Sequence, residues 1–334
     1  MKKAYYLYLL IITLIFFTNG CRDIKSYPAN YSRHQSNSYY PVDIENYKSN
    51  REKTLIRFEQ KPERVIANQQ NTIETLLALH QDDSIIAASC TSNHTTEFLK
   101  KYESRAKALP NINRYNFDLE TALMLKPDFI IGWQSTFSDR VLRGTDFWNK
   151  RNVKTYIVEN SNSLLTNGTL EDEYRFIANM GKIFNEQESA LKIIQEIQNE
   201  INLTTLKTRH LKKSKVIILE LMGNNITVYG KNRLGGDMVK RLGGDLIDSK
   251  SRISAEDLIL LDPDVIFVVC IGWKEDAEAC VARVKNNKVY RSITAVRENR
   301  IYAIPLMYMY ASSTRTIDGI KVIKNGLYPE LKGL

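Results

Sequence analysis

Two well-separated segments of the chain share one pattern, in which an apolar helical stretch ends at Pro-Asp and an apolar strand follows. In the first copy Glu120 opens the helical stretch and Pro127-Asp128 ends it, and in the second copy Glu256 and Pro263-Asp264 hold the same positions. Proline cannot continue a helix, and the β-branched and aromatic run after it indicates a buried strand. Gly-Trp then follows each strand, at 132–133 and 272–273. A helix–turn–strand motif used twice predicts two similar lobes with a cleft between them.

The N-terminus has the features of a signal peptide over residues 1–20. Two lysines precede an apolar run over residues 4–17, which is too short to span a bilayer. Gly20-Cys21 then resembles the lipobox of bacterial lipoproteins, in which the cysteine is acylated and becomes the mature N-terminus. Thr18 departs from that motif, which favours leucine there, so an uncleaved signal anchor is the alternative. We expect cleavage before Cys21 and attachment to a membrane through a lipid on that cysteine.

Removal of residues 1–20 leaves 334 − 20 = 314 residues, and the formal net charge falls by two lysines from +9 to about +7. That length suits two α/β lobes. The basic residues are spread along the chain, apart from short pieces such as Lys212-Lys213. A spread of this kind predicts a solvated surface and no nucleic-acid partner.

Three cysteines follow Cys21, namely Cys90, Cys270 and Cys280. In an exported protein the simple arithmetic is one disulfide and one thiol, and we prefer Cys270 with Cys280 because that bridge would close one loop. Buried unpaired thiols are the other possibility. The four histidines are scattered without ligand spacing, which argues against a dedicated metal site. The sequence also lacks phosphate-loop, serine-elbow and Cys–His patterns, so we expect neither an enzyme nor a bound cofactor.

The order of predicted elements divides the mature chain into a tether, two lobes and a connecting helix. Residues 21–54 are rich in Ser, Asn, Tyr and charge without a sustained period, which predicts a lipid anchor and flexible tether. Strands and helices alternate over 55–165 and again over 209–334, which favours parallel βα arrangements. One long helical pattern covers 166–208, with a possible break near Phe184-Asn185. The predicted fold class is α/β, with two mostly parallel sheets flanked by helices, joined by one long α-helix, and a ligand cleft between the lobes.

This organisation resembles the substrate-binding proteins of ATP-driven importers for iron-siderophores, cobalamin and haem, whose lobes are joined by one long helix. The resemblance covers residues 60–330. It is carried by Pro62-Glu63-Arg64-Val65-Ile66-Ala67, the two repeated segments, the helical pattern between the lobes, and the Arg-Glu-Asn-Arg-Ile-Tyr run at 297–302. It implies a monomeric binding protein that closes little around its cargo and delivers it to an ABC permease and its ATPase.

The resemblance also implies a role for Glu120 and Glu256. They hold the positions at which members of this family carry a surface glutamate that docks on arginines of the permease. Two carboxylates at a fixed separation would report on both lobes and steer docking in a salt-dependent way. The alternative is that each glutamate only complements the dipole of the helix whose first turn it occupies.

Ligands of open parallel sheets bind beyond the carboxyl ends of the strands, and that rule selects the candidate cargo contacts. In the first lobe they are Asn68, Gln69, Ser89, Thr91 and Trp133, and in the second they are Met222, Tyr229, Arg233, Trp273, Met307, Tyr308 and Tyr310. Trp133 and Trp273 could sandwich a flat, largely apolar ligand, or each could pack against its own helix. Lys231, Arg233 and Arg315 could neutralise an anionic ferric complex or a propionate, or could be plain surface.

The sequence therefore predicts an exported, lipid-anchored binding protein on the extracytoplasmic face of a bacterial membrane, with an iron chelate as cargo. A ferric siderophore is the first candidate, and cobalamin and haem are the alternatives. Two rivals belong to other classes. One is an enzyme on a related α/β sheet, and the other is a surface adhesion or scavenging lipoprotein that meets no permease.

Overall fold

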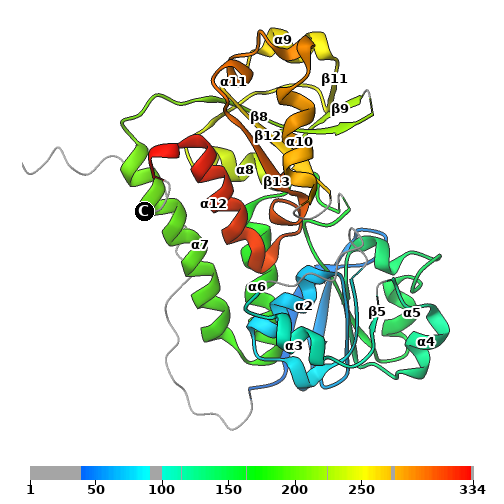
Figure 1. Ribbon diagram of the computed structural model, residues 1–334. Helices are drawn as coiled ribbons and strands as arrows, with labels where there is room; N and C mark the ends of the chain where they lie inside the picture. The colour runs from blue at the N-terminus through cyan, green and yellow to red at the C-terminus, as the bar shows by residue number, and fades with distance from the viewer. Residues whose placement is uncertain are drawn as a thin grey trace, which may run out of the picture. The chain divides into compact units, whose positions relative to one another are not determined.

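A computed structural model describes residues 39–90, 100–113, 115–162, 164–223, 225–271 and 275–331. From Tyr40 onward the chain forms one compact unit, which contains two separate larger β-sheets (Figure 1). Within these ranges we find no helix of the length and apolarity that a bilayer crossing requires. The prediction of two α/β lobes is confirmed.

The first lobe is built on a parallel five-stranded sheet with the strand order β5-β4-β3-β6-β7. Its strands are β3 (Val65–Asn68), β4 (Ile85–Ser89), β5 (Ile112–Asn113), β6 (Phe129–Gly132) and β7 (Lys154–Ile157). Its helices are α2 (Gln70–Ala78), α3 (Glu103–Ala108), α4 (Leu119–Met124) and α5 (Thr145–Asn149), with 3-10 turns η1 (Asp82–Ser84) and η2 (Gln134–Phe137).

Helices cover both faces of this first sheet. Val65 of β3 packs in one apolar cluster with Ile73 of α2. Its neighbour Ile66 points to the opposite face, where Ala122 of α4 and Trp148 of α5 belong to the same cluster. Every residue of β3 and β6 is buried, as expected of central parallel strands covered on both faces.

The second lobe carries a six-stranded sheet, in which β11-β9-β8-β12-β13 are neighbours and β10 also pairs with β8. Its strands are β8 (Lys215–Met222), β9 (Asn225–Val228), β10 (Asp245–Leu246), β11 (Arg252–Ile253), β12 (Val265–Cys270) and β13 (Ile301–Pro305). Its helices are α8 (Leu234–Arg241), α9 (Ala255–Leu261), α10 (Glu275–Lys285), α11 (Thr294–Arg297) and α12 (Thr316–Leu327), with 3-10 turns η3 (Lys288–Tyr290), η4 (Leu306–Tyr308), η5 (Ser313–Arg315) and η6 (Pro329–Leu331). The strands β8, β10, β12 and β13 are parallel, whereas β9 and β11 form antiparallel pairs at one edge.

The repeated sequence motif forms equivalent structures in the two lobes, α4 followed by β6 and α9 followed by β12. The Asp128 carboxylate accepts hydrogen bonds from the backbone N–H groups of Glu63 (2.8 Å) and Arg64 (3.0 Å), just before β3. The Asp264 carboxylate accepts one from the backbone N–H of Lys215, the first residue of β8, at 2.7 Å. In both lobes the proline ends the helix and the aspartate holds the start of the neighbouring parallel strand, which explains why Pro-Asp occurs twice.

Residues 42–58 form a β-hairpin, so the prediction of a flexible tether extending to residue 54 is wrong over its last part. Strands β1 (Val42–Tyr47) and β2 (Lys53–Phe58) pair antiparallel. Ile44 is buried in the core, and the Asn46 side chain both accepts from Ile157 N (2.8 Å) and donates to Ile157 O (3.0 Å) on the edge strand β7. The alternation of apolar and polar residues in β1 is a strand pattern, but it is short and lies within a polar segment.

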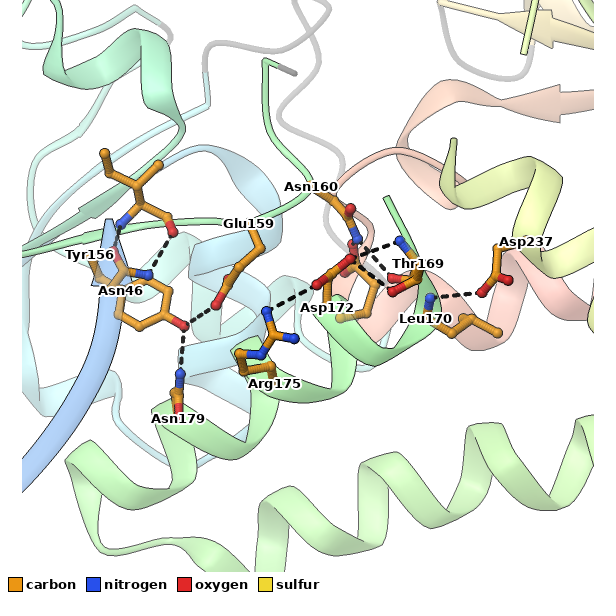
Figure 2. A network of polar contacts seen from close by, with 12 residues as sticks. Asn46, Tyr156, Glu159, Asn160, Thr169, Leu170, Asp172, Arg175, Asn179 and Asp237 are labelled. Atoms are coloured by element: carbon orange, nitrogen blue, oxygen red, sulfur yellow. Dashed lines mark hydrogen bonds and ion pairs between the residues drawn. The ribbon is translucent and has the colours of Figure 1, made fainter. Parts of the chain in front are cut away.

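The predicted single connecting helix is two helices, α6 (Leu170–Phe184) and α7 (Gln187–Thr208). Asn185 ends α6 in the left-handed conformation with φ 58°, which asparagine tolerates better than most residues. The chain then turns back, and Figure 2 shows α6 and α7 side by side. A Cβ atom on Gly181 of α6 would overlap Ala190 of α7, so this glycine permits the close approach. The break occurs at the position where the sequence pattern weakens.

One contiguous apolar core runs through both lobes. It includes Phe129 of the first sheet, Ile177 and Met180 of α6, and Ile218 and Phe267 of the second sheet. Separate clusters fill the outer face of each sheet. Because the lobes share buried apolar surface through α6, a large rotation of one lobe against the other would expose part of it to water.

Candidate functional site

The two lobes meet where the segment after β13 packs on α2 and on Trp133, which directly follows β6. A small cavity lies in this contact and is lined by Gln70, Asn71, Trp133, Leu306, Met307, Tyr310, Ala311 and Arg315. Its volume is about 20 Å³, whereas pockets for small molecules enclose about 300–1,000 Å³. At this contact, the side chains of the described residues therefore leave little space between the lobes.

Trp133 is held by its own lobe and faces the other. Its indole N–H donates to Asn71 Oδ1 of α2 at 3.0 Å. Its ring meets Tyr310 of the second lobe edge to face, with the ring centroids 5.5 Å apart. Aromatic pairs of this kind contribute about 0.5–1.5 kcal/mol beyond their buried area, so a ligand that separated them would face only a modest cost.

A buried ion pair joins the lobes behind this aromatic contact. Arg315 of η5 donates through Nε to Glu74 Oε2 (2.5 Å) and through Nη2 to Glu74 Oε1 (2.6 Å) on α2. The two side chains are 1% and 0% exposed. Burial lowers the pKa of Arg315, but the hydrogen bonds and charge of Glu74 outweigh that effect and hold the pKa above its ordinary value. Arg315 is thus a structural cation and not a plain surface residue, which was one of the two alternatives left open by the sequence.

The start of η5 and the loop before it are fastened to the first lobe and to α6. Asn71 Nδ2 donates to Ser313 Oγ at 3.2 Å, and the backbone N–H of Ser313 donates to Glu173 Oε2 of α6. The other oxygen of Glu173 accepts from Asn160 of the first lobe at 2.8 Å. Ala311 and Ser313 have φ values of 44° and 51°, a left-handed conformation that non-glycine residues adopt under constraint. This loop is held in a strained conformation by partners on both sides of the cleft.

The N-terminus of α6 is fixed by a polar network that reaches both lobes (Figure 2). Asn160 donates to the carbonyl of Thr169 at 3.0 Å, and Thr169 donates through its N–H and Oγ1 to Asp172 at 2.9 and 2.8 Å. The N–H of Leu170 donates to Asp237 of α8 in the second lobe at 3.0 Å. A side chain of the second lobe therefore accepts from a first-turn N–H of α6, and a side chain of the first lobe donates to the carbonyl of its N-cap residue.

A buried carboxyl group lies further along the same network, between β7 and α6 (Figure 2). Glu159 Oε1 accepts from the Tyr156 hydroxyl at 2.7 Å, and that hydroxyl accepts from Asn179 of α6 at 2.9 Å. Burial raises the pKa of Glu159 to about 8, and the hydrogen bond from Tyr156 offsets part of that rise. Its second oxygen has no hydrogen-bond partner among the described residues. Glu159 is thus mainly protonated at neutral pH.

Because Glu159 is protonated in the folded protein, we expect the free energy of unfolding to fall as the pH rises. Between pH 4.5 and about 8 the folded protein keeps a proton on Glu159 that the unfolded chain has released, so the free energy of unfolding decreases across this window. Glu159→Gln keeps an acceptor for Tyr156 and cannot ionise. We expect the free energy of unfolding, measured with urea, to decrease over this pH range by about a few kcal/mol more in the wild type than in this variant. The exposed control Glu196→Gln should follow the wild type, and parallel curves for all three proteins would contradict the assignment.

Three polar residues predicted as cargo contacts in the first lobe lie at the strand ends but face inward. The amide of Asn68 donates to Asn116 Oδ1 at 2.8 Å, and its oxygen accepts from Thr136 at 3.1 Å. Gln69 and Ser89 are buried, and neither lines the inter-lobe cavity. Thr91, Trp273 and the lipidation candidate Cys21 lie outside the described residues.

The second-lobe candidates divide into two groups. Met307 and Tyr310 line the cavity, where Met307 Sδ accepts from Arg315 Nη1 at 2.7 Å. The ring of Tyr308 has its centroid 5.9 Å from the Arg315 guanidinium carbon. Away from the cavity, Met222 is 56% exposed, Tyr229 donates to Glu220 at 2.7 Å, and Arg233 is half-buried at the start of α8. Burial is the main cause that raises the pKa of Tyr229, so this hydroxyl stays protonated.

A larger groove, which the sequence did not indicate, lies on the first lobe beside the N-terminus of α4. It encloses about 700 Å³ and is lined by Tyr115, Asn116, Phe117, Asp118, Leu119, Asp139, Arg140, Val141 and Arg143. These residues come from the loops that follow β5 and η2 and from the start of α4, beyond the carboxyl ends of β5 and β6. Arg140 and Arg143 are exposed and form no ion pair within the described part of the chain. The sequence signal that could have indicated this groove is the pair of closely spaced arginines, Arg140 and Arg143, after strand β6.

The predicted disulfide between Cys270 and Cys280 is not formed in the structure. Cys270 ends β12, where its thiol donates to the carbonyl of Val268 on its own strand at 3.6 Å. Cys280 lies on α10 and packs with the apolar cluster on the outer face of the second sheet. Each side chain behaves as a small apolar group of its own element.

The sequence and the fold are similar to those of known proteins. The periplasmic binding protein family matches residues 65–307. The chain belongs to this family. An ABC transporter substrate-binding lipoprotein of Bacillus subtilis, YvrC, is 21% identical over 311 residues, which cover 89% of this chain and 88% of that protein. A periplasmic binding protein of Veillonella parvula shares the fold with a TM-score of 0.81 and 32% identity, over 87% of this chain and 92% of the other.

A third likeness shows the fold alone. The structure described as an ABC-type Fe3+-hydroxamate transport system of Saccharomonospora viridis has a TM-score of 0.68 and 17% identity, over 86% of this chain and 99% of the other. As a periplasmic binding protein, the chain is a substrate-binding component of transport and not an enzyme. The predicted family and class are confirmed.

Glu120 and Glu256 occupy equivalent exposed positions in this periplasmic binding protein. Each lies in the first turn of a short helix, α4 or α9. Asp118 caps the first helix by accepting from Thr121 N–H at 2.7 Å, and Ser254 caps the second by accepting from Asp257 N–H at 3.1 Å. Because other side chains cap the helices, neither glutamate is needed for that purpose, and both carboxylates face solvent.

Proposed function

We propose that this binding protein captures a ferric siderophore between its lobes and delivers it to an ABC permease, acting as a monomer. The observation that carries the proposal is the contact of Trp133 with Tyr310 across the lobes, beside Met307 and at the carboxyl ends of the sheet strands. Aromatic and thioether side chains suit a large, partly apolar chelate. The description of the Saccharomonospora viridis structure as a ferric hydroxamate system supports this class of cargo.

The charge of a ferric chelate would be met by groups other than Arg315, because Glu74 already neutralises that residue. Arg140 and Arg143 line the large groove at the same edge of the first sheet and are exposed. Guanidinium groups hold carboxylates and other planar oxyanions through paired hydrogen bonds. We therefore assign to these two arginines the recognition of an anionic chelate, while the aromatic pair contacts its apolar part.

A lipid on Cys21 would hold the protein at the extracytoplasmic face of the membrane. The likeness to a lipoprotein of Bacillus subtilis supports this anchor. Exposed Glu120 and Glu256, one on each lobe, would dock on basic residues of the permease. Cobalamin and haem are the alternative cargoes of this proposal.

The cargo assignment predicts a change in tryptophan fluorescence. Titration of the chain over residues 22–334 with ferric siderophores, cobalamin and haemin should quench emission for one class, because cargo must separate Trp133 from Tyr310. Trp133→Phe should lose most of the quenching while calorimetry still detects binding, and Trp148→Phe should retain it because Trp148 is fully buried between α5 and the sheet.

Arg140→Gln with Arg143→Gln should weaken an anionic chelate by about tenfold or more and leave a neutral one unaffected. If only cobalamin or only haemin quenches the emission, that ligand replaces the ferric siderophore as the assigned cargo. A lack of binding to every ligand, by fluorescence and by calorimetry, would refute the cargo assignment.

A further inference from the structure

The C-terminal end of α7 exposes a group of leucines. On the core side of the helix, Ile197 and Ile201 are buried. On the other side Leu203 and Leu206 are 56% and 60% exposed, and Leu211, just after the helix, is 38% exposed. Leu203 and Leu206 are neighbours on the helix surface because they are three residues apart. A single exposed leucine needs no explanation, whereas a group at one end of a helix indicates a contact surface.

Basic residues lie among and directly after these leucines in the sequence. Lys207, Arg209, Lys212 and Lys213 are all exposed, and the sequence has no aspartate or glutamate from residue 201 to residue 214. The acid that precedes this stretch, Glu200, is paired with Lys324 of α12 at 2.8 Å. We call the three leucines and these four cations the α7 tip. Apolar and cationic groups mixed in this way are typical of surfaces that lie on anionic bilayers.

We propose that the α7 tip is a contact surface for a lipid bilayer with anionic headgroups. Its leucines enter the interface between headgroups and acyl chains, and its cations lie at the level of the phosphates. Each basic residue close to an anionic surface adds to the attraction, and the leucines add apolar burial that salt does not screen. The absence of carboxylates from the whole segment favours an anionic lipid surface over a mixed-charge protein interface.

The length of chain before the hairpin is compatible with this contact. The Tyr40 hydroxyl donates to the carbonyl of Ile183 at 2.7 Å, next to the turn from which α7 starts. With 22 residues, α7 is about 33 Å long. The 40 − 21 = 19 residues from Cys21 to Tyr40 can span at most about 65 Å. A lipid on Cys21 and the α7 tip can therefore reach the same bilayer.

The tip would act as a second, weak membrane signal beside the lipid. Its use in the cell rests on the lipid anchor in the proposed function, but its affinity for a bilayer does not. A lipid on Cys21 would keep the bilayer at a high local concentration, so the tip needs only weak affinity to hold the domain in one orientation. Release of the tip, for example at high salt, would free the domain to turn toward the permease.

The test uses the chain over residues 22–334, which lacks Cys21 but retains every element of the compact unit that begins at Tyr40. Co-sedimentation is measured with vesicles of phosphatidylcholine alone and of equal parts phosphatidylglycerol and phosphatidylcholine. We expect binding only to the anionic vesicles, weakened by salt. Replacing Lys207, Arg209, Lys212 and Lys213 with glutamine should weaken it by at least about tenfold. Leu203→Ser with Leu206→Ser should also weaken it by about tenfold.

A matched control removes exposed groups elsewhere on the second lobe. Lys285→Gln, Lys288→Gln, Arg291→Gln and Leu260→Ser should leave vesicle binding within about twofold of the wild type. Equal losses in the control would show that net charge alone attracts the protein and would overturn the proposal. So would absence of vesicle binding, or a dimer in ultracentrifugation that the leucine variant disrupts. Cargo titration of the same variants should be unchanged, which separates this result from failure of the cargo assignment.

Discussion

Glu74→Gln is expected to destabilise the protein by about 3–5 kcal/mol, which is a large fraction of the stability of an ordinary domain. The change keeps the shape of the side chain and removes its charge. It removes the carboxylate that pairs with the Arg315 guanidinium, which is only 1% exposed at the contact between the lobes. The hydrogen bonds and charge of Glu74 hold the pKa of Arg315 above its ordinary value against the opposing effect of burial. Without Glu74, the cation loses the strongest of its favourable interactions, while the unfavourable effect of burial remains.

The measurement is urea unfolding followed by circular dichroism, with fluorescence as a second probe to test for two-state behaviour. Lys192→Ala breaks the exposed pair between Lys192 and Glu188 of α7 and should cost at most about 0.5 kcal/mol. Glu74→Leu with Arg315→Met removes both charges and should recover much of the loss, because two apolar side chains of similar size need no partner. A Glu74→Gln protein as stable as the Lys192→Ala control would show that the buried pair contributes little.

Reversal of both docking charges, Glu120→Lys with Glu256→Lys, should reduce uptake of the cargo to background while its affinity for the isolated protein stays unchanged. Each glutamate is exposed on a helix that another residue caps, so the substitutions should barely change the fold. Like charges placed against basic residues of a permease oppose docking by several kcal/mol. Because the two sites lie on different lobes, each single reversal should give an intermediate loss.

The measurement is uptake of radiolabelled iron chelate by cells that produce each variant at equal level. The control reverses two other exposed glutamates, Glu196→Lys on α7 and Glu278→Lys on α10, and should transport as the wild type does. Higher ionic strength should slow docking of the wild-type protein to the purified permease. Full uptake by the double variant at Glu120 and Glu256 would refute the docking role. That result would favour a lipoprotein that does not contact a permease through Glu120 and Glu256.

Much of the fold could be predicted from the sequence, because its strongest signals are local. The helix periods, the Pro-Asp stops and the apolar runs of β6 and β12 belong to segments of about a dozen residues, within which spacing alone indicates the structure. The hairpin at 42–58 was missed because its short alternating pattern lies in a polar stretch. The helix break at Asn185 required a left-handed residue and a turn, which periodicity indicates only weakly.

In the candidate site, too, features that depend on local sequence could be predicted, and features that depend on contacts between distant segments could not. Trp133 follows a strand, and the structure has it at the contact between the lobes, because the carboxyl ends of parallel strands share one edge. The role of Arg315 could not be inferred, since its partner Glu74 is 241 residues away in the sequence. Nor could the sequence show that Glu173 accepts from Asn160 of one lobe and Ser313 of the other.

The sequence by itself determined two similar α/β lobes, their order and the paired glutamates, because each depends on a local pattern repeated along the chain. Only the tertiary structure decided how the lobes are held together and which polar groups face the cleft. Those properties depend on burial, and burial is set by contacts between segments far apart in the chain. A charge such as that of Arg315 is a surface cation or a structural one according to what surrounds it, and its own sequence neighbours do not determine those surroundings.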